Sequence, residues 1–283
     1  MPGEFPQRPL IFVAHPDDES LAFGGLLQRL PVSLVVFATN GASAGFGLER
    51  KFGSMEAYAT LRAREVSRVF RHIPQASFET IARPDGSRFS DMHLFEELPE
   101  AAMCLRGIAQ SFAPDAIISH AYEGAHLDHD ACSFLTMHVA AALSLKRFEF
   151  PLYWLDGRGA AVRQQFRDAP SREPAGQLEG AVADIMEWHL SEAEIACKKE
   201  MLAEYQTQHG TVSEFLRGAG AERMRVATTE GSSFSMALCR DYMYQERRPR
   251  FYHTRHHRLP AKTLLKKFAE FEEWRKHRKD WRP

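Results

Sequence analysis

Short apolar runs alternate with amphipathic segments through the first half of the chain. Each run is continuous rather than alternating with polar residues, which is typical of strands that are buried on both faces of a sheet. The predicted strands are Leu10–Val13, Val32–Thr39, Ser77–Ala82, Ala116–Ser119 and Phe148–Leu155.

Between these runs the apolar positions recur at helical spacing. In residues 57–70, for example, Leu61, Val66, Val69 and Phe70 fall near one face, with charged residues elsewhere. The predicted helices are Leu21–Arg29, Ser54–Arg71, Leu94–Gln110 and Ala131–Leu145. Strands that alternate with helices predict a mostly parallel sheet with right-handed crossovers and helices on both faces, the doubly wound α/β class.

The pattern changes after residue 155. Asp156 to Gly180 is rich in Gly, Pro, Arg and Gln, which indicates a linker or a loop. Ser191 and Glu194 have capping-box spacing, which predicts a helix over Ser191–Tyr205. We therefore divide the chain into a core of residues 1–180, a small, mainly helical appendage of residues 181–246 and a tail of residues 247–283.

The tail is basic although the whole chain has a net charge of only −1. It combines an aromatic, basic stretch with a helix-like run, AKTLLKKFAEFEEWRKHRK. Four interpretations are open: partner or oligomer contact, attraction to an anionic membrane or nucleic acid, solubility, or packing on the chain's own domain. The aromatic residues favour packing, so we expect no nucleic-acid partner, while peripheral membrane contact and a homo-oligomer stay open.

Composition places the chain among globular proteins, with 44% hydrophobic and 11% aromatic residues. The N-terminal residues show no secretory signal, and the most apolar helical stretch is too short to span a bilayer, which needs roughly 20 residues. Cys104, Cys132, Cys197 and Cys239 are far apart and form no C-x-x-C pair, as expected for thiols in a reducing compartment. A cytoplasmic protein is the resulting expectation.

Two polar clusters follow predicted strands. "HPDDE", residues 15–19, comes directly after the first strand, and "HAYEGAHLDHD", residues 120–130, follows the strand Ala116–Ser119. Ligands of open α/β sheets bind beyond the carboxyl ends of the strands, so the clusters converge if these strands are neighbours. A divalent cation between them would explain why several carboxylates are crowded together, because it would keep them ionised.

The spacing suggests a role for each residue. His15, Asp18 and His129 supply the three ligands of a zinc-type catalytic site, which leaves a position open for water. Asp17 is then free to act as the base on that water, whose pKa the cation lowers to about 7. His126 would donate to the developing oxyanion or the leaving amine, with Asp128 orienting its ring. We expect His120 to be a structural residue or one that supports a ligand, and Glu19 receives no role.

These residues resemble the PIG-L/LmbE-like zinc-dependent N-acetylglucosaminyl deacetylases. The match comprises "AHPDDE", residues 14–19, and "YEGAHLDHDA", residues 122–131, although Leu127 stands where the family commonly has proline. Weaker similarities are "ATNGASAG" after the second strand, "RARE" at 62–65, "RPDG" at 83–86 and "KKEMLAEYQTQ" at 198–208. The resemblance spans residues 8 to about 210 and does not include the tail.

The resemblance implies a Rossmann-like sheet, a Zn²⁺ cofactor and the same assignment of ligands and base. Fe²⁺ or another divalent metal could replace zinc in the cell. It also suggests that Arg62 and Asp85 bind sugar hydroxyls or a phosphate, whereas a plain solvated arginine is the alternative for Arg62. Tyr122 could line the pocket, and residues 41–53, which include Phe46, could form a lid or a passive loop.

The implied activity is removal of the N-acetyl group from an N-acetylglucosamine-type sugar or its conjugate. The nearest alternative is an amidase that cleaves a larger acyl group or a thiol conjugate. A mononuclear non-haem iron oxygenase would use a similar ligand set, but the parallel sheet and the free Asp17 argue against it. A non-catalytic sugar-binding relative is the third alternative, and the complete set of polar groups argues against that one.

Overall fold

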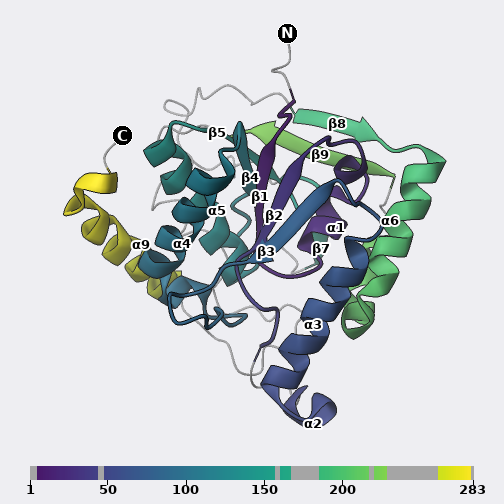
Figure 1. Cartoon of the computed structure of the whole chain (residues 1–283), viewed down its shortest axis with the longest axis horizontal. Helices are drawn as coiled ribbons and strands as arrows, with labels where there is room; N and C mark the ends of the chain where they lie inside the picture. Colours follow the sequence, from purple (N-terminus) through teal and green to yellow (C-terminus); the bar gives the residue numbers. More distant parts are fainter. Residues whose placement is uncertain are drawn as a thin grey trace.

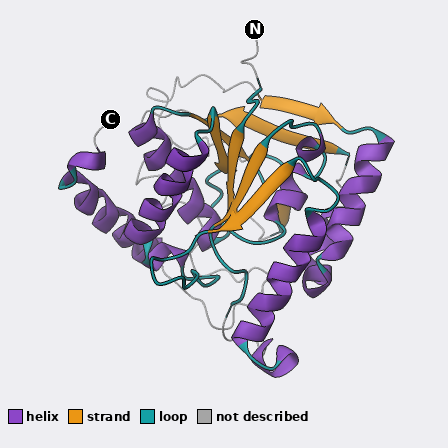
Figure 2. Cartoon of the chain, viewed as in Figure 1, coloured by secondary structure: helices purple, strands orange, loops and turns teal. Residues whose placement is uncertain are grey.

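The computed structural model describes residues 5–43, 48–156, 160–166, 185–216, 220–227 and 261–281. Its centre is a mostly parallel sheet with helices on both faces (Figures 1 and 2), as the sequence predicts. The strands lie in the order β3-β2-β1-β4-β5-β9-β8, and β1 to β5 are parallel. The parallel strands are β1 (Pro9–Val13), β2 (Ser33–Phe37), β3 (Ala76–Thr80), β4 (Ala116–His120) and β5 (Lys146–Phe150).

The helices of the first half connect these strands and cover the sheet. They are α1 (Asp18–Phe23), the 3-10 turn η1 (Leu26–Gln28), α2 (Leu48–Phe52), α3 (Met55–Val69), η2 (Leu94–Glu96), α4 (Leu98–Phe112) and α5 (Leu127–Leu143). In β1, Leu10 and Phe12 belong to the core beneath α4 and α5, whereas Ile11 and Val13 belong to the opposite core beside α1 and α3. Because successive strand residues face opposite sides, an all-apolar β1 fills both cores.

One predicted strand ends earlier than expected. The apolar run Phe148–Leu155 is broken after Phe150, and Tyr153–Leu155 forms β6, which pairs with β7 (Ala161–Arg163) in a separate two-stranded sheet. Pro151 lacks the amide hydrogen that a continuing ladder would use. The buried carboxylate of Glu123 accepts hydrogen bonds from the amides of Leu152 (2.6 Å) and Tyr153 (3.1 Å), which fixes the new direction.

The chain after residue 184 extends the sheet as well as adding helices. It contains β8 (Ile185–His189), α6 (Glu192–Glu204), η3 (Gln206–Gln208), α7 (His209–Phe215) and β9 (Ala221–Val226). Strand β9 pairs antiparallel with β5, and β8 pairs antiparallel with β9. The predicted capping box of Ser191 and Glu194 is present at the start of α6. The helical content was expected, but the two edge strands were not. The domain division at residues 180 and 246 stays a prediction.

The described part of the tail is the helix α9 (Ala261–Lys276) and the turn η5 (Lys279–Trp281). Helix α9 lies beside α4 (Figure 1), and its apolar residues are buried in the core on the α5 face. Phe268 stacks on Phe134 with ring centroids 4.0 Å apart, and Phe271 meets the same ring edge-on. This part of the tail therefore packs on its own domain; the aromatic stretch before it lies outside the described residues. Within the described residues, no helix has the length and apolar character to cross a bilayer.

A buried ion pair ties the edge strands to α1. The ammonium of Lys198, on α6, lies 2.7 Å from Oε1 of Glu222, on β9, and both side chains are almost fully buried. Lys198 also donates to the carbonyl of Leu21, and Glu222 accepts from the amides of Gly25 and Leu26. The pair thus satisfies backbone groups at the end of α1.

Replacing Lys198 by methionine is expected to lower the free energy of unfolding by about 3–5 kcal/mol, because Glu222 would keep a buried charge without its partner. Urea denaturation followed by circular dichroism measures the change. Lys199→Met is the matched control, since Lys199 is the exposed neighbour on the same helix. A loss in Lys198→Met no larger than in the control would show that the ion pair does not stabilise the fold.

Candidate metal-dependent active site

The two polar clusters meet where the strand order of the sheet reverses. After β3 the chain crosses back to β4, which pairs with β1 on the side away from β2. A crevice beyond the carboxyl ends of strands at such a switch point is the usual ligand site of open α/β sheets. The loops after β1 and β4 carry the two clusters to this position at the carboxyl edge of the sheet.

Both clusters lie on the first turn of a helix. Helix α1 begins at Asp18 with Asp17 as its N-cap, and α5 begins at Leu127 with His126 as its N-cap. The sequence pattern placed both starts a few residues later, because the polar motif residues interrupt the apolar periodicity. The early starts fix Asp18 and His129 on helical backbone, which holds their side chains more rigidly than a loop would.

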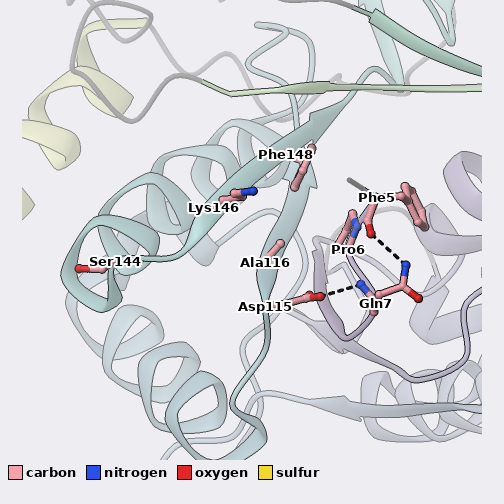
Figure 3. A pocket seen from close by; sticks show the side chains of 8 residues that line it. All are labelled: Phe5, Pro6, Gln7, Asp115, Ala116, Ser144, Lys146 and Phe148. Carbon is pink, nitrogen blue, oxygen red and sulfur yellow. Dashed lines mark hydrogen bonds between the residues drawn. The ribbon is translucent and has the colours of Figure 1, made fainter. Parts of the chain in front are cut away.

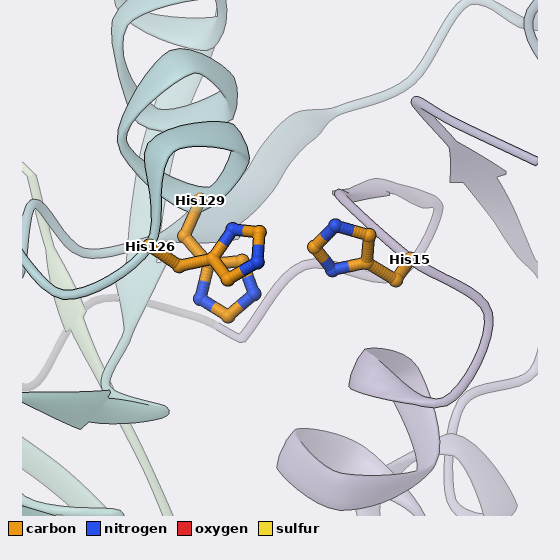
Figure 4. Close-up of side chains that lie close together, drawn as sticks. All are labelled: His15, His126 and His129. Carbon is orange, nitrogen blue, oxygen red and sulfur yellow. The ribbon is translucent and has the colours of Figure 1, made fainter. Parts of the chain in front are cut away.

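The three expected metal ligands lie together. Asp18 contacts both histidines: Oδ2 is 3.3 Å from His15 Nδ1, and Oδ1 is 3.5 Å from His129 Nε2. Figure 4 shows the ring of His15 facing the rings of His126 and His129, which come from the other segment. The ligand role itself stays a prediction. Among the described residues, the sets around His129 that could hold one ion combine it with Asp18 and His120, or with His15 and His126.

The chemistry of these donors fits a divalent cation. Burial acts to raise the pKa of Asp18, but His129 and His120 outweigh it and hold that pKa well below its ordinary value. Burial lowers the pKa of His129 well below its ordinary value, so the ring is neutral and can ligate. The buried Nδ1 atoms of His120 and His129 have no hydrogen-bond partner among the described residues. Burial acts to lower the pKa of His15, but Asp91, Asp128 and Asp18 outweigh it and hold that pKa well above its ordinary value, so a cation would have to displace the proton of this ring. Two imidazoles and a carboxylate are a ligand set that Zn²⁺ and Fe²⁺ accept.

Asp17 lies beside this group but points to other partners. Its Oδ2 atom is 3.4 Å from the guanidinium of Arg62. Burial raises the pKa of Asp17 to about 8 against the opposing effect of Arg62. A carboxyl whose pKa lies near neutrality is suited to accept a proton and return it, so the geometry is compatible with the expected role as base.

His126 has a defined tautomer. The amide of Asp128 donates to His126 Nδ1 at 3.2 Å, so Nε2 carries the hydrogen of the neutral ring. Burial, followed by the neighbouring His15, lowers the pKa of His126 to about 4, which keeps the ring neutral at pH 7. Its Nε2–H group is therefore available as a hydrogen-bond donor.

The carboxylate of Asp128 does not orient His126 as we expected. Its Oδ2 atom accepts from the amide of Met92 at 2.6 Å and lies 3.3 Å from His15 Nε2, and its Oδ1 atom accepts from the amide of Leu94 at 3.3 Å. Asp128 thus fixes the His15 ring and the loop before α4, while only its backbone amide reaches His126. A carboxylate on the second nitrogen of a ligating histidine is a common supporting arrangement in metal sites.

Sequence reasoning missed Asp91. Its Oδ1 atom is 3.1 Å from His15 Nε2, and burial acts to raise its pKa while the contact with His15 lowers it. Asp91 stands in "FSDMHLF", which has no motif spacing to the other site residues. Only the crossover from β3 to β4 brings it to the site, so no local signal in the sequence could have revealed it.

The three expected substrate-binding residues have different positions. Arg62 is only 2% exposed, so it is not the solvated arginine of the alternative interpretation, and it donates to the carbonyl of Pro16. Asp85 lies in an exposed turn, where it accepts from the amide of Ser87, and no described contact joins it to the cluster. Tyr122 is half-buried and packs against the core beneath α5. The structure gives no support to Asp85 as a sugar ligand.

His120 and Glu19, for which the sequence suggested little, are both fully buried at the site. His120 Nε2 accepts from the amide of Ala14 at 3.2 Å and lies 3.4 Å from Asp18 Oδ2, so it supports a predicted ligand. Glu19 accepts from the amide of Asp17 at 3.0 Å. Both residues therefore hold the first cluster in place.

The loop after β2 closes against the first cluster. Thr39 donates to the carbonyl of Ala14, and Gly41 has a positive φ of 64°. A Cβ at Gly41 would lie 2.8 Å from Pro16 and 2.9 Å from Arg62, which explains the glycine. The expected lid at 41–53 is described only in part: α2 belongs to it, but Phe46 lies outside the described residues.

A separate cavity of about 600 Å³ lies at the other end of the sheet (Figure 3). Its lining includes Asp115 and Ala116 at the start of β4 and Lys146 at the start of β5. These are the amino ends of parallel strands, where α/β proteins rarely bind ligands, and Asp115 is already bonded to the amides of Gln7 and Arg8. We therefore assign the site to the histidine–aspartate cluster.

Comparison with known proteins agrees with this architecture. The structure resembles a deacetylase of the teicoplanin biosynthesis pathway (TM-score 0.54, 15% identity, 78% of this chain and 98% of that chain). It also resembles N,N'-diacetylchitobiose deacetylase from Pyrococcus horikoshii (TM-score 0.51, 15% identity, 80% and 85%). The 4-carboxy-2-hydroxymuconate hydratase from Pseudomonas putida shares the fold too (TM-score 0.53, 13% identity, 75% and 84%). At these identities the likeness establishes the fold alone, and no curated protein matches the chain by sequence.

The sequence match is more specific than the fold. The model of the PIG-L family, described as GlcNAc-PI de-N-acetylase, matches residues 10–140. That segment runs from β1 to α5 and contains both polar clusters and the crossover that brings Asp91 to them. The PIG-L family model therefore matches the part of this chain that contains the candidate site.

Proposed function

We propose that the protein is a metal-dependent hydrolase that removes the N-acetyl group from an N-acetylglucosamine-type amino sugar or its conjugate. The observation that carries the proposal is the contact of Asp18 with both His15 and His129. Asp17 lies buried beside them, and its carboxylate contacts Arg62 instead of the three predicted ligands. The PIG-L match and the two deacetylases of similar fold support the same reaction class.

In this proposal His15, Asp18 and His129 hold the cation. A divalent metal there lowers the pKa of a water ligand and polarises an acyl carbonyl. Asp17 accepts a proton from the attacking water as the new C–O bond forms, and returns it to the nitrogen as the C–N bond breaks. Acetate and a free amine are the products.

His126 and Arg62 assist the reaction in different ways. The Nε2–H group of the neutral His126 ring donates to the carbonyl oxygen as negative charge develops there. A neutral ring with a pKa of about 4 is a poor proton source, which leaves Asp17 as the group that protonates the amine. Arg62 fixes the orientation of Asp17.

Acetate release from a panel of N-acetylglucosamine glycosides, with and without a chelator, tests the proposal. We expect acetate from at least one glycoside, loss of the activity with the chelator and recovery with added Zn²⁺ or Fe²⁺. Mass spectrometry of the sugar identifies the reaction, because deacetylation leaves the sugar without its acetyl group. No acetate from any glycoside would favour the amidase that cleaves a larger acyl group or a thiol conjugate. A cytoplasmic location also stays a prediction.

A further inference from the structure

The segment from Tyr205 to Thr207, at the junction of α6 and η3, belongs to a sequence motif that the proposed chemistry does not use. We propose that Tyr205 and Thr207 are positioning residues that, through Glu19 and Arg62, hold Asp17 in the strained backbone conformation that its catalytic role requires. The proposal rests on the proposed function for that role, but its structural content can be tested separately.

Asp17 has an unusual backbone. Its φ is 130° and its ψ is −28°, values that residues with a side chain rarely adopt. Such a conformation persists only where the surroundings impose it, and it is found preferentially at functional sites. This conformation turns the chain sharply between β1 and α1. The side chains of Asp17 and Asp18 therefore have different partners: Asp17 contacts Arg62, and Asp18 contacts His15 and His129.

One set of hydrogen bonds reaches the backbone of Asp17. Its amide donates to Oε2 of Glu19 at 3.0 Å, and the hydroxyl of Tyr205 donates to Oε1 of Glu19 at 2.6 Å. The hydroxyl of Ser20 donates to the same Oε1 at 2.5 Å. Glu19 and Tyr205 are at most 1% exposed, so water does not replace these bonds.

A second set reaches the carboxylate of Asp17. Arg62 contacts Oδ2 of Asp17 at 3.4 Å and donates to the carbonyl of Pro16. Glu65 lies 3.4 Å from Arg62, and it accepts from both the amide and the hydroxyl of Thr207, each at 2.7 Å. The Arg62 guanidinium also lies over the Tyr205 ring, 5.6 Å from its centroid. The two sets therefore start from the same three-residue segment.

The backbone of this segment explains why it can serve both sets. Helix α6 ends at Glu204, and Tyr205 has φ −80° and ψ 59°, outside the helical region. The break frees the amide of Thr207 from helical hydrogen bonding, so that it donates to Glu65 instead. Neither Tyr205 nor Thr207 has a described contact with a histidine of the cluster, so both act through Glu19 and Arg62.

The variant Tyr205→Phe removes one hydroxyl and keeps the ring. A hydrogen bond to a charged group stabilises by about 1.5–3 kcal/mol, so we expect kcat to fall by about 10- to 100-fold with little change in KM and an unchanged metal content. A crystal structure should show Asp17 relaxed from its φ of 130°. Thr207→Val should act in the same direction through Arg62, with a smaller fall in kcat because the amide of Thr207 is kept.

Thr136→Val is the matched control, because it also removes a fully buried hydroxyl, whose described bonds go to the carbonyls of Cys132 and Ser133 on α5. It should lower thermal stability without changing kcat. An unchanged kcat together with an unchanged Asp17 backbone in Tyr205→Phe would overturn the positioning role. A wild-type protein that releases no acetate would instead contradict the proposed function, and the Asp17 backbone in the crystal structures of wild type and Tyr205→Phe would still decide the positioning.

Discussion

Replacing Asp18 by alanine is expected to abolish both metal binding and hydrolysis. Asp18 is the residue that contacts His15 and His129 together, and it also accepts from the amide of His15 at 2.8 Å. Its loss removes the anionic ligand and loosens the His15 side of the site. Removing only a supporting residue costs metal sites about 10- to 100-fold in affinity, so loss of a direct ligand should cost more. Activity should then fall to the background of the assay.

Metal content of the purified variant, measured by inductively coupled plasma mass spectrometry, is the primary readout. Glu100→Ala is the control, because Glu100 is an exposed carboxylate on the neighbouring helix α4. The control should keep the metal content and the activity of the wild type. A folded Asp18→Ala protein that retains stoichiometric metal would mean that the cation is held by another set, such as His15, His126 and His129, whose donor atoms lie within 4.8 Å of one another.

Replacing Asp17 by asparagine is expected to separate catalysis from metal binding. The amide side chain has the same shape but cannot accept a proton, so the variant loses general acid–base catalysis, which contributes about 10²- to 10⁴-fold. Asp17 has contacts with Arg62 and Glu19 rather than with the three predicted ligands. The metal content should therefore match that of the wild type while kcat falls by that factor.

The pair of variants gives a clear division of roles. The Asp17→Asn variant should contain the metal and lack activity, whereas the Asp18→Ala variant should lack both the metal and the activity. Full activity in Asp17→Asn would exclude Asp17 as the base, and loss of the metal in that variant would assign Asp17 to the coordination sphere instead. In either case His126, whose ring lies against that of His15, would become the candidate for proton transfer.

Local sequence determined the elements that build the site. Continuous apolar runs predicted the parallel strands because a strand buried on both faces needs apolar residues at successive positions. The spacing of His15 and Asp18 predicted that both face one point, since the turn that joins them is local. The capping box at Ser191 was readable for the same reason. The sequence therefore predicted the fold class and brought the three candidate ligands into one hypothesis.

Only the tertiary structure decided which residues support those ligands. Asp91 and Tyr205 reach His15 and Glu19 across long stretches of chain, and Asp128 was assigned to the wrong imidazole. The new direction of the chain after Pro151 also depends on a distant residue, because Glu123 accepts from the amides of Leu152 and Tyr153. Hydrophobic pattern records which face of an element is buried, whereas the partner of a buried polar group depends on how the crossovers pack, and the sequence contains no local record of that.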